Sequence, residues 1–407
     1  HRSMTLLVSL VLAAGLLGVL LAQPALAATC TASAAGNWSN AGTWSNCNSG
    51  VPTASDDVVI DSSVTVTVDA DAYANNITLS GGGTGTRLTL SSSNTLSVSG
   101  TLNSDATSLS QSLITGAGVL KFVGSSRALF GSNWAANPPS WNLEIALNTG
   151  ATGTVSTNVK AGDIKINSGT LDMGSKDLRA DTNAQGGGVL SVASGAVLRM
   201  GGGDITRTGT ASTGYFSAFT LNGTLDYYAT TVGSINANAI SFNGTVEYSA
   251  NGAQSLVAKT SSGGGSANPD TYTDLRLGGS GAKTLTQDTA VNGTLRLAGT
   301  ANLGLGSYSL TYGANSTLEY AGSSAQTTAS VELPASGGPT NVTINNSLGV
   351  TLHAPRTVTG ALTLSSGRLS LGNNTLTLGS SATVSGSPDA SKMVVTDVNG
   401  SQTGKLC

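Results

Sequence analysis

The chain carries little charge. Only 10% of its 407 residues are Asp, Glu, Lys or Arg, whereas soluble domains carry about 25%. The 18 basic and 21 acidic residues give a net charge of −3, and no basic run exists, so a nucleic-acid partner is excluded. Because 39% of the residues are hydrophobic and evenly spread, a disordered chain is excluded as well.

Histidine is almost absent, which limits the chemistry that the chain can perform. A Ser-His-Asp or Cys-His arrangement would depend on His353, because the other histidine is His1. No serine motif stands beside His353 in the sequence, and its position after Leu352 predicts a turn residue at a strand end. Zinc-ligand clusters are also missing. We therefore expect no catalytic residue, no metal site and no cofactor, and we predict that the protein is not an enzyme.

The three cysteines are Cys30, Cys47 and Cys407. In an oxidising compartment, Cys30 and Cys47 would form a disulfide that closes a short loop. The alternative is two unpaired small residues, and we favour the disulfide. Cys407 is the last residue, and we expect the chain to be truncated there.

The N-terminal segment predicts export. Residues 6–22 form an apolar run that contains one polar residue, Ser9, and Ala25 and Ala27 fit an A-x-A cleavage site. This pattern predicts a secretory signal peptide over residues 1–27. An uncleaved membrane anchor is the alternative because the run approaches spanning length, but Pro24 and the cleavage site favour removal. We expect a protein that is secreted or exposed on the cell surface.

Internal repeats dominate the rest of the chain. The motif at Asn222–Leu225 (Asn-Gly-Thr-Leu) recurs at Asn243–Val246 with Val in place of Leu, and Asn292–Leu295 is echoed at Asn315–Leu318. A longer repeat spans about three of these short steps, and fixed periods in this range are typical of a solenoid. The longer repeat aligns residues 302–318 with 368–384, with identical residues at Leu303/Leu369, Leu305/Leu371, Gly306/Gly372, Leu310/Leu376, Thr311/Thr377, Gly313/Gly379 and Thr317/Thr383.

The pattern within each repeat is that of a strand. Apolar and polar residues alternate at Val64–Val68 and again at Leu303–Leu305, and Gly and Asn-Gly turns separate the short runs. An antiparallel sandwich or barrel also fits this alternation. The repeat period of about 22 residues favours a right-handed, single-stranded parallel β-helix. Three short strands and three turns of this total length make one coil, and coils stack about 4.8 Å apart. We predict a capping region over residues 28–60 and the β-helix over residues 61–407.

Two regions carry a resemblance to known proteins. Residues 36–60, GNWSNAGTWSNCNSGVPTASDDVVI, resemble the start of many large bacterial secreted proteins with β-helical passengers, and loosely the opening of G8-type domains. Residues 362–386 and 391–400 resemble the repeats of surface proteins exported by Bacteroidetes-type secretion systems. The resemblance implies a secreted or surface-displayed parallel β-helix of the adhesin or autotransporter-passenger kind. It implies no catalytic residue.

One charged row is a candidate for sugar binding. If Leu178 points inward, alternation places Asp177, Arg179 and Asp181 together on the outer face. A row of carboxylate, guanidinium and carboxylate groups suits a sugar. It fits equally well a solvated group of charges that contributes little.

Other residues allow a binding or a structural interpretation. Clustered carboxylates suit calcium, but we favour turn and strand-end roles for the acidic cluster near the first coil. The tryptophans could stack on sugars, but we expect Trp38 and Trp44 to plug the end of the core and Trp134 and Trp141 to cover a coil. The acidic cluster comprises Asp56, Asp57, Asp61, Asp69 and Asp71.

Together these observations predict a structural or adhesive surface protein. Its Ser-, Thr- and Asn-rich surface would contact glycans or other cell-surface components. Unpaired strand edges at the ends of the rod could also support self-association. The alternative is a polysaccharide-degrading enzyme, a lyase or a glycoside hydrolase, on the same scaffold.

Overall fold

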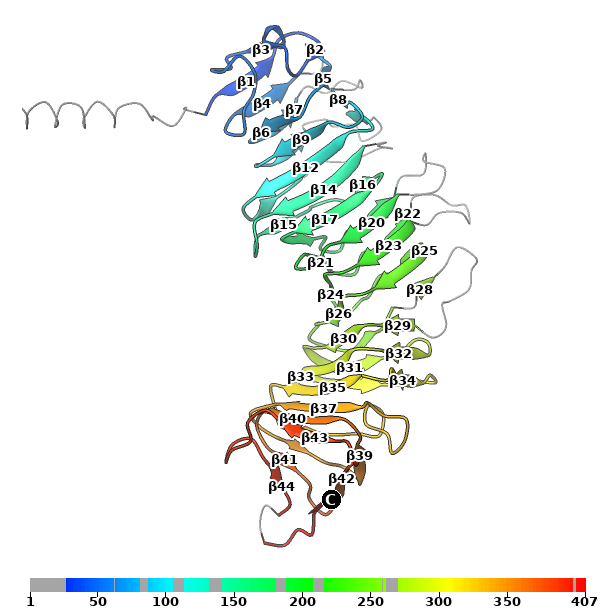
Figure 1. Cartoon of the computed structure of the whole chain (residues 1–407). Coiled ribbons are helices and arrows are strands. Elements are labelled where there is room, and N and C mark those ends of the chain that lie inside the picture. Colours follow the sequence, from blue (N-terminus) through cyan, green and yellow to red (C-terminus); the bar gives the residue numbers. More distant parts are fainter. Residues whose placement is uncertain are drawn as a thin grey trace, which may run out of the picture.

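The chain winds into a parallel β-solenoid with coils of about 23 residues (Figure 1). The computed structural model describes residues 27–61, 63–80, 87–104, 113–131, 141–180, 188–207, 216–257, 259–260, 270–397 and 400–407. Within these ranges the structure is all-β apart from one 3-10 turn, η1 (Ala41–Thr43). The described part forms an elongated rod, with the first strands at one end and the last strands at the other.

Successive coils stack their strands into three columns, and a bridge from Leu102 to Phe130 connects the two sheets of the first column. The first column contains β1 (Thr29–Ala32), β4 (Asp57–Ile60), β7 (Ile77–Leu79), β10 (Leu102–Ser104), β13 (Arg127–Ala128), β15 (Thr152–Thr154), β18 (Thr170–Asp172), β21 (Val197–Met200), β24 (Thr224–Tyr227), β26 (Thr245–Tyr248), β30 (Asp274–Leu277), β33 (Thr294–Gly304), β35 (Thr317–Gly322), β37 (Asn341–Asn345), β40 (Ala361–Ser366) and β43 (Thr383–Ser385).

The other two columns share a 12-stranded sheet, in which β25 links them, and otherwise consist of sheets of three or four strands and of β27 and β31, which belong to the 14-stranded sheet. The second contains β2 (Gly36–Asn37), β5 (Val66–Val68), β8 (Leu88–Leu90), β11 (Ile114–Gly116), β16 (Val159–Ala161), β19 (Leu178–Ala180), β22 (Ile205–Arg207), the start of β25 (Ile235–Phe242), β27 (Gln254–Ser255), β28 (Lys259–Thr260), β31 (Ser280–Thr284), β36 (Gln326–Thr327), β38 (Val350–Thr351), β41 (Leu369–Ser370) and β44 (Val394–Val395). The third contains β6 (Ala72–Ala74), β9 (Thr95–Val98), β12 (Val119–Gly124), β14 (Asn142–Leu147), β17 (Ile164–Ser168), β20 (Val189–Val192), β23 (Phe216–Leu221), β29 (Asp270–Tyr272), β32 (Thr289–Val291), β34 (Leu310–Tyr312), β39 (Arg356–Val358), β42 (Thr375–Leu378) and β45 (Lys405–Leu406).

The sequence repeats are the register of the stack. Thr224 pairs with Thr245, and Thr294 pairs with Thr317, so each motif lies directly on its copy in the next coil. The predicted parallel arrangement is confirmed and the antiparallel sandwich is wrong. Among the paired strands of the described residues, the antiparallel pair is β1 with β3 (Trp44–Ser45) at the N-terminal end.

Alternating burial builds one continuous core inside the coils. Strand β14 alternates partly buried and buried residues throughout its length, as a strand with one face inside the solenoid must. Burying each aliphatic side chain stabilises the fold by about 1.5–3 kcal/mol. The inward positions of the first column are at most 3% exposed at Leu171, Leu198, Leu225, Val246, Leu275, Leu295, Leu318, Val342 and Leu362.

The Asn-Gly-Thr repeat has a physical cause at a corner of the coil. A Cβ atom on Gly244 would lie 2.1 Å from the carbonyl oxygen of Gly223 one coil earlier, so only glycine lets the two backbones approach this closely. Beside them, Asn243 donates a hydrogen bond from Nδ2 to Oδ1 of Asn222 at 3.0 Å. Equivalent asparagines therefore stack, as the repeat predicts.

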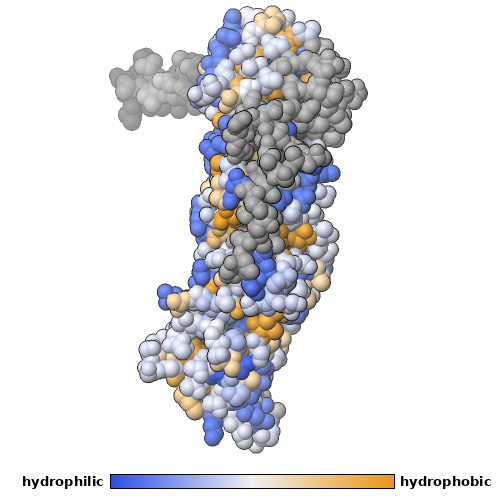
Figure 2. Space-filling view, turned by 90° about the vertical axis from the view of Figure 1, so that its right-hand side faces the viewer, coloured by the Kyte–Doolittle hydropathy of each residue, from blue (hydrophilic) through white to orange (hydrophobic). Residues whose placement is uncertain are grey.

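The N-terminal region joins the stack directly. Cys30 of β1 pairs in parallel with Val58 of β4, so residues 28–60 supply the first two strands of the first column. Residues 1–26, which include nearly all of the predicted signal peptide, lie outside the described residues. Within the described part, no helix is long and apolar enough to cross a membrane. Figure 2 shows hydrophilic and hydrophobic residues interspersed along the side of the rod that it displays.

Replacing Leu225 with alanine is expected to lower the free energy of unfolding by about 2–5 kcal/mol, because the side chain is fully buried between two coils. The matched control is Leu348→Ala, since Leu348 is 62% exposed; we expect a change within about 0.5 kcal/mol. Denaturant unfolding measures both. Equal effects would contradict the assignment of the Leu225 column to the core.

Candidate functional site

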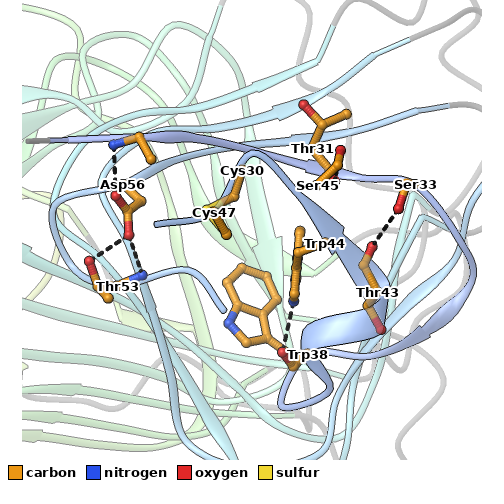
Figure 3. Close-up of a disulfide and its surroundings, with 11 residues drawn as sticks. Cys30, Thr31, Ser33, Trp38, Thr43, Trp44, Ser45, Cys47, Thr53 and Asp56 are labelled. Atoms are coloured by element: carbon orange, nitrogen blue, oxygen red, sulfur yellow. Dashed lines mark hydrogen bonds between the residues drawn. A yellow bond between two sulfur atoms is a disulfide. The ribbon is translucent and has the colours of Figure 1, made fainter. Parts of the chain in front are cut away.

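A disulfide and two tryptophans close the N-terminal end of the core (Figure 3). Cys30 and Cys47 are joined, with their Cα atoms 4.7 Å apart. The rings of Trp38 and Trp44 pack edge to face at 4.9 Å, and Nε1 of Trp44 donates to the carbonyl oxygen of Trp38 at 2.8 Å. Both tryptophans are at most 7% exposed. This packing supports the plug and leaves no ring face on which a sugar could stack.

The other two tryptophans, Trp134 and Trp141, were expected to cover a coil. Trp141 is 1% exposed, so its ring belongs to the core and cannot act as an open ligand platform. Trp134 lies outside the described residues.

The carboxylates of the acidic cluster have separate structural partners. Asp56 accepts hydrogen bonds from Thr53 and from the backbone N–H of Ala28. Burial alone would raise the pKa of Asp56, but these hydrogen bonds hold it below its ordinary value. Asp69 accepts hydrogen bonds from Ser39, which lower its pKa although burial opposes them.

The other two carboxylates with defined bonds follow the same pattern. Asp57 accepts hydrogen bonds from Asn75 and Asn76, and Asp71 accepts one from the backbone N–H of Thr95. Across the described ranges, no group of three acidic, histidine or cysteine side chains converges as metal ligands would. The hydrogen bonds of these carboxylates are those of turn and strand-end residues.

Asp177 and Arg179, two members of the charged row considered for sugar binding, bond to each other and to other groups of the protein. Arg179 Nη2 lies 2.5 Å from Oδ2 of Asp177. The other oxygen of Asp177 accepts the backbone N–H of Asp204 at 2.9 Å, and Asp177 donates its own N–H to Asn158 Oδ1. Asp181, the third member of the row, lies outside the described residues.

These bonds reveal a ladder of side-chain caps along one corner. Asn158, Asp177 and Asp204 each accept the backbone N–H of the corresponding residue in the next coil, and the last acceptor bonds Ser234 at 2.7 Å. The cap satisfies an N–H that would otherwise lack a partner where the strand begins. A second ladder connects Asn142, Asp163 and Val189. Carboxylates at such positions serve the stacking of coils.

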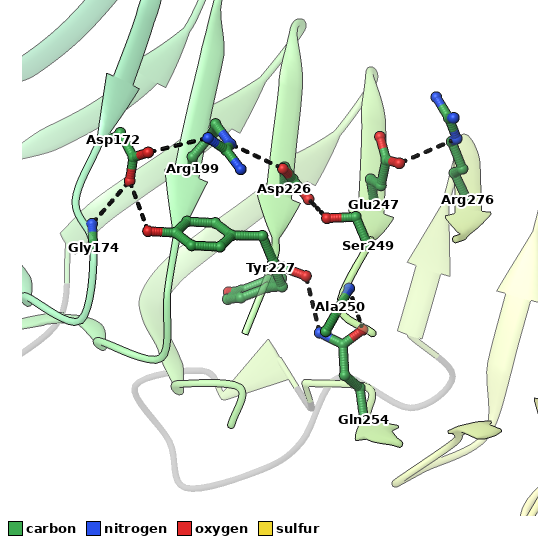
Figure 4. A network of polar contacts seen from close by, with 11 residues as sticks. Asp172, Gly174, Arg199, Asp226, Tyr227, Glu247, Ser249, Ala250, Gln254 and Arg276 are labelled. Carbon is green, nitrogen blue, oxygen red and sulfur yellow. Dashed lines mark hydrogen bonds and ion pairs between the residues drawn. The ribbon is translucent and has the colours of Figure 1, made fainter. Parts of the chain in front are cut away.

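A column of charged side chains, not predicted from the sequence, follows the outer face of the first column (Figure 4). Strand register places its members on consecutive coils. Arg199 lies between two carboxylates, with nitrogen–oxygen distances of 3.1 Å to Asp172 and 3.1 Å to Asp226. The column comprises Asp172, Arg199, Asp226, Glu247, Arg276, Arg296 and Glu319.

An aromatic ring reinforces this column. The guanidinium of Arg199 lies 4.3 Å from the ring centroid of Tyr228, whose hydroxyl donates to Asp172 at 3.0 Å. Burial raises the pKa of Glu247, although the positive charge of Arg276 at 3.1 Å opposes that shift. The charges are thus largely paired within the column, which fixes the register of neighbouring coils.

Two members of the charged column could be recognised as equivalent from the sequence. Asp226 and Glu247 occupy equivalent places in the two Asn-Gly-Thr repeats. Arg199, however, pairs with Asp226 across a longer coil than the one that separates Asp226 from Glu247. Finding Arg199 therefore requires an alignment of coils of unequal length.

His353 has serine and threonine neighbours that the sequence did not indicate. It lies at the corner between β38 and β39, in agreement with the predicted turn position. Its ring nitrogens lie 2.6 Å from Thr328 Oγ1 and 3.0 Å from Ser330 Oγ. These partners belong to the preceding coil, so they are neighbours of His353 in space although no serine motif stands beside it in the sequence.

No protein-family model, curated protein or solved structure matches the chain.

Removing the N-terminal disulfide is expected to destabilise the first coils by about 2–5 kcal/mol, because the bond restricts the unfolded chain. Thermal unfolding of a Cys30→Ala, Cys47→Ala double variant tests this. Cys407→Ser is the matched control, since Cys407 is a free, exposed cysteine. An unchanged melting curve for the double variant would show that the Trp38–Trp44 plug holds this end without the disulfide.

Asp177 offers a test that separates the two interpretations of the charged row. Asp177→Asn keeps an oxygen for the N–H of Asp204 and should leave stability nearly unchanged. Asp177→Ala removes the acceptor and should cost about 1–3 kcal/mol. Equal stability of the two variants, measured by denaturant unfolding, would contradict the capping role.

Proposed function

We propose that the protein is a secreted or cell-surface structural rod whose hydroxyl-rich outer faces contact glycans or neighbouring cells. The N-terminal sequence pattern supports export, and the resemblance to bacterial surface proteins supports an adhesive role. The observation that carries the proposal is the stacking of hydroxyl side chains at equivalent outward positions of successive coils.

Two such hydroxyl columns lie near opposite ends of the rod. In the second column of strands, Thr67, Thr89 and Thr115 stand opposite one another on three coils, and the hydroxyls of the last two are 3.3 Å apart. Their side chains point outward because the residues on both sides of Thr67 and Thr89 are buried.

The second hydroxyl column lies on strands β37, β40 and β43. Thr343 pairs with Thr363, which pairs with Ser385, and the last two hydroxyls are 2.9 Å apart. Coils stack about 4.8 Å apart, so each column presents hydroxyl groups at a constant spacing on a rigid support. Glycans are recognised through hydroxyl hydrogen bonds, and repeated weak contacts combine into strong attachment.

The charge pattern is consistent with this role. Lys121 is paired with Glu144 at 2.6 Å, and Arg296 with Glu319 at 2.7 Å. Because these charges are paired with each other, the hydroxyl and amide groups between the ion pairs determine what the outer surface can bind. The interaction is therefore expected to depend weakly on salt, unlike one that is driven by unpaired charge.

Substitution of one hydroxyl column tests the proposal. Replacing Thr67, Thr89 and Thr115 by valine preserves strand-forming side chains of similar shape but removes three hydroxyl groups. We expect binding of the purified chain to immobilised cell-surface polysaccharides to fall about tenfold or more, since the lost contacts act together.

Two controls accompany this measurement. The same substitutions at Thr343 and Thr363 show whether the second column contributes, and binding in raised salt tests the independence from charge. Failure of the unmodified chain to bind any polysaccharide or cell surface would overturn the adhesive role. Shortening of the polysaccharide on incubation would favour the enzyme alternative instead.

A further inference from the structure

The corner between β38 and β39 brings together a serine, a histidine and an arginine from two coils. Ser330 and Thr328 lie in the segment that follows β36, and His353 and Arg356 lie one coil later. Ser330 is exposed to solvent, whereas Arg356 is 7% exposed. An accessible hydroxyl thus lies beside a buried, fixed cation.

The hydrogen bonds around His353 determine which ring nitrogen carries the proton. Nε2 lies 2.6 Å from Nη2 of Arg356. A guanidinium can only donate, so Nε2 must accept and the ring proton is on Nδ1. Nδ1 then donates to Thr328 Oγ1 at 2.6 Å. The backbone N–H of His353 donates to the same oxygen at 3.0 Å, which fixes the orientation of the ring.

In this tautomer the single lone pair of Nε2 is shared between Arg356 Nη2 and the hydroxyl of Ser330. The serine hydroxyl lies 3.0 Å from Nε2 of His353, within the distance needed for proton transfer. Arg356 Nη2 donates to Ser330 Oγ at 2.9 Å. Burial and the charge of Arg356 lower the pKa of His353 below 6.5, so the imidazole is neutral at physiological pH and can accept a proton.

Arg356 is held rigidly in this position. Its Nε donates to the carbonyl oxygen of Leu333 at 2.6 Å, and its Nη1 donates to that of Pro355 at 2.7 Å. A fixed cation beside a nucleophile is the arrangement that stabilises an oxyanion without reorganisation.

We propose that Ser330, His353 and Arg356 form a nucleophilic centre that hydrolyses small acyl esters. This inference goes beyond the display function and does not depend on it. It departs from the sequence-based expectation that the protein is not an enzyme, because the three residues meet only when coils stack. Thr328 is a positioning residue, since it acts through the ring of His353.

The reaction balances with the groups present and water. Ser330 Oγ attacks the acyl carbon while His353 Nε2 takes the hydroxyl proton, and Nη2 of Arg356, which lies beside Ser330 Oγ, donates to the oxyanion. The C–O bond to the alcohol breaks, and the alcohol leaves with the proton from Nε2. Water then attacks the acyl-serine and gives a proton to His353 Nε2. The Oγ–C bond breaks, Ser330 Oγ takes that proton from Nε2, and the carboxylic acid is released.

Covalent labelling by a fluorophosphonate tests the centre directly, because this probe reacts with activated serines. We expect one adduct, assigned to Ser330 by peptide mass spectrometry. Labelling should slow by about 100-fold or more in His353→Gln, as expected for the loss of a general base. Ser324→Ala removes an exposed serine of the same segment and should leave labelling unchanged. Circular dichroism and thermal unfolding establish that each variant is folded.

The pH dependence provides a readout that a purely structural cluster would not give. The labelling rate should rise as pH increases through the lowered pKa of His353 and stay constant above about 6.5, where the imidazole is neutral. Arg356 is the charged group that faces the ring. Glu332 also titrates nearby, since burial raises its pKa; Glu332→Gln controls for it and should keep the same profile.

Hydrolysis of 4-nitrophenyl acetate completes the test. The unmodified chain should release 4-nitrophenol faster than Ser330→Ala by about 100-fold or more. Absence of an adduct on Ser330 in the unmodified chain, or equal labelling of Ser330 in His353→Gln, would overturn the proposal. Either result would assign the cluster to corner stability alone.

Discussion

The described strands inside the rod depend on the backbone hydrogen bonds that they share with neighbouring coils. These parallel bonds require neighbouring strands to remain in register, so residues at equivalent places in successive coils lie on one another. An interior leucine then meets a leucine, and a corner glycine meets a backbone. At Gly244 the carbonyl oxygen of Gly223 leaves no room for a side chain. The composition follows from this stacking, because each column accepts few residue types.

The same constraint explains the use of acidic residues in a chain that has few charges. Where a strand turns a corner, an N–H of the next coil needs an acceptor, and the short side chains of Asp and Asn reach it. Asp177 receives such a bond from Asp204, and Asp163 from Val189. Carboxylates used in this way are held by the fold and are poor candidates for catalysis or metal binding. Ion pairs such as Arg199 with Asp226 lie between corners and link coils across the strands.

Much of the fold, but little of its chemistry, follows from the sequence. The repeat step from Thr224 to Thr245 predicted the strand register correctly, because both copies of the motif keep the same place in their coils. Other coils differ in length: the step from Gly153 to its partner Leu171 is short, and the step from Val246 to Leu275 is much longer. A single period cannot align such coils. The column through Arg199 and the contact of His353 with Ser330 were missed for that reason, since each joins residues whose separation varies with corner length.

Irregular corners are therefore where a repetitive rod can acquire specific chemistry. A regular column repeats one side chain and offers many equal, weak contacts. Between β36 and β37 the corner instead follows its own path, with Leu333 N–H bonded to the carbonyl oxygen of Ala329 and Tyr320 bonded to Glu332. This turn positions Ser330 over the next coil, against His353 and the buried Arg356. Stacking supplies the rigid support, and the departure from the repeat supplies three unlike side chains at hydrogen-bonding distance.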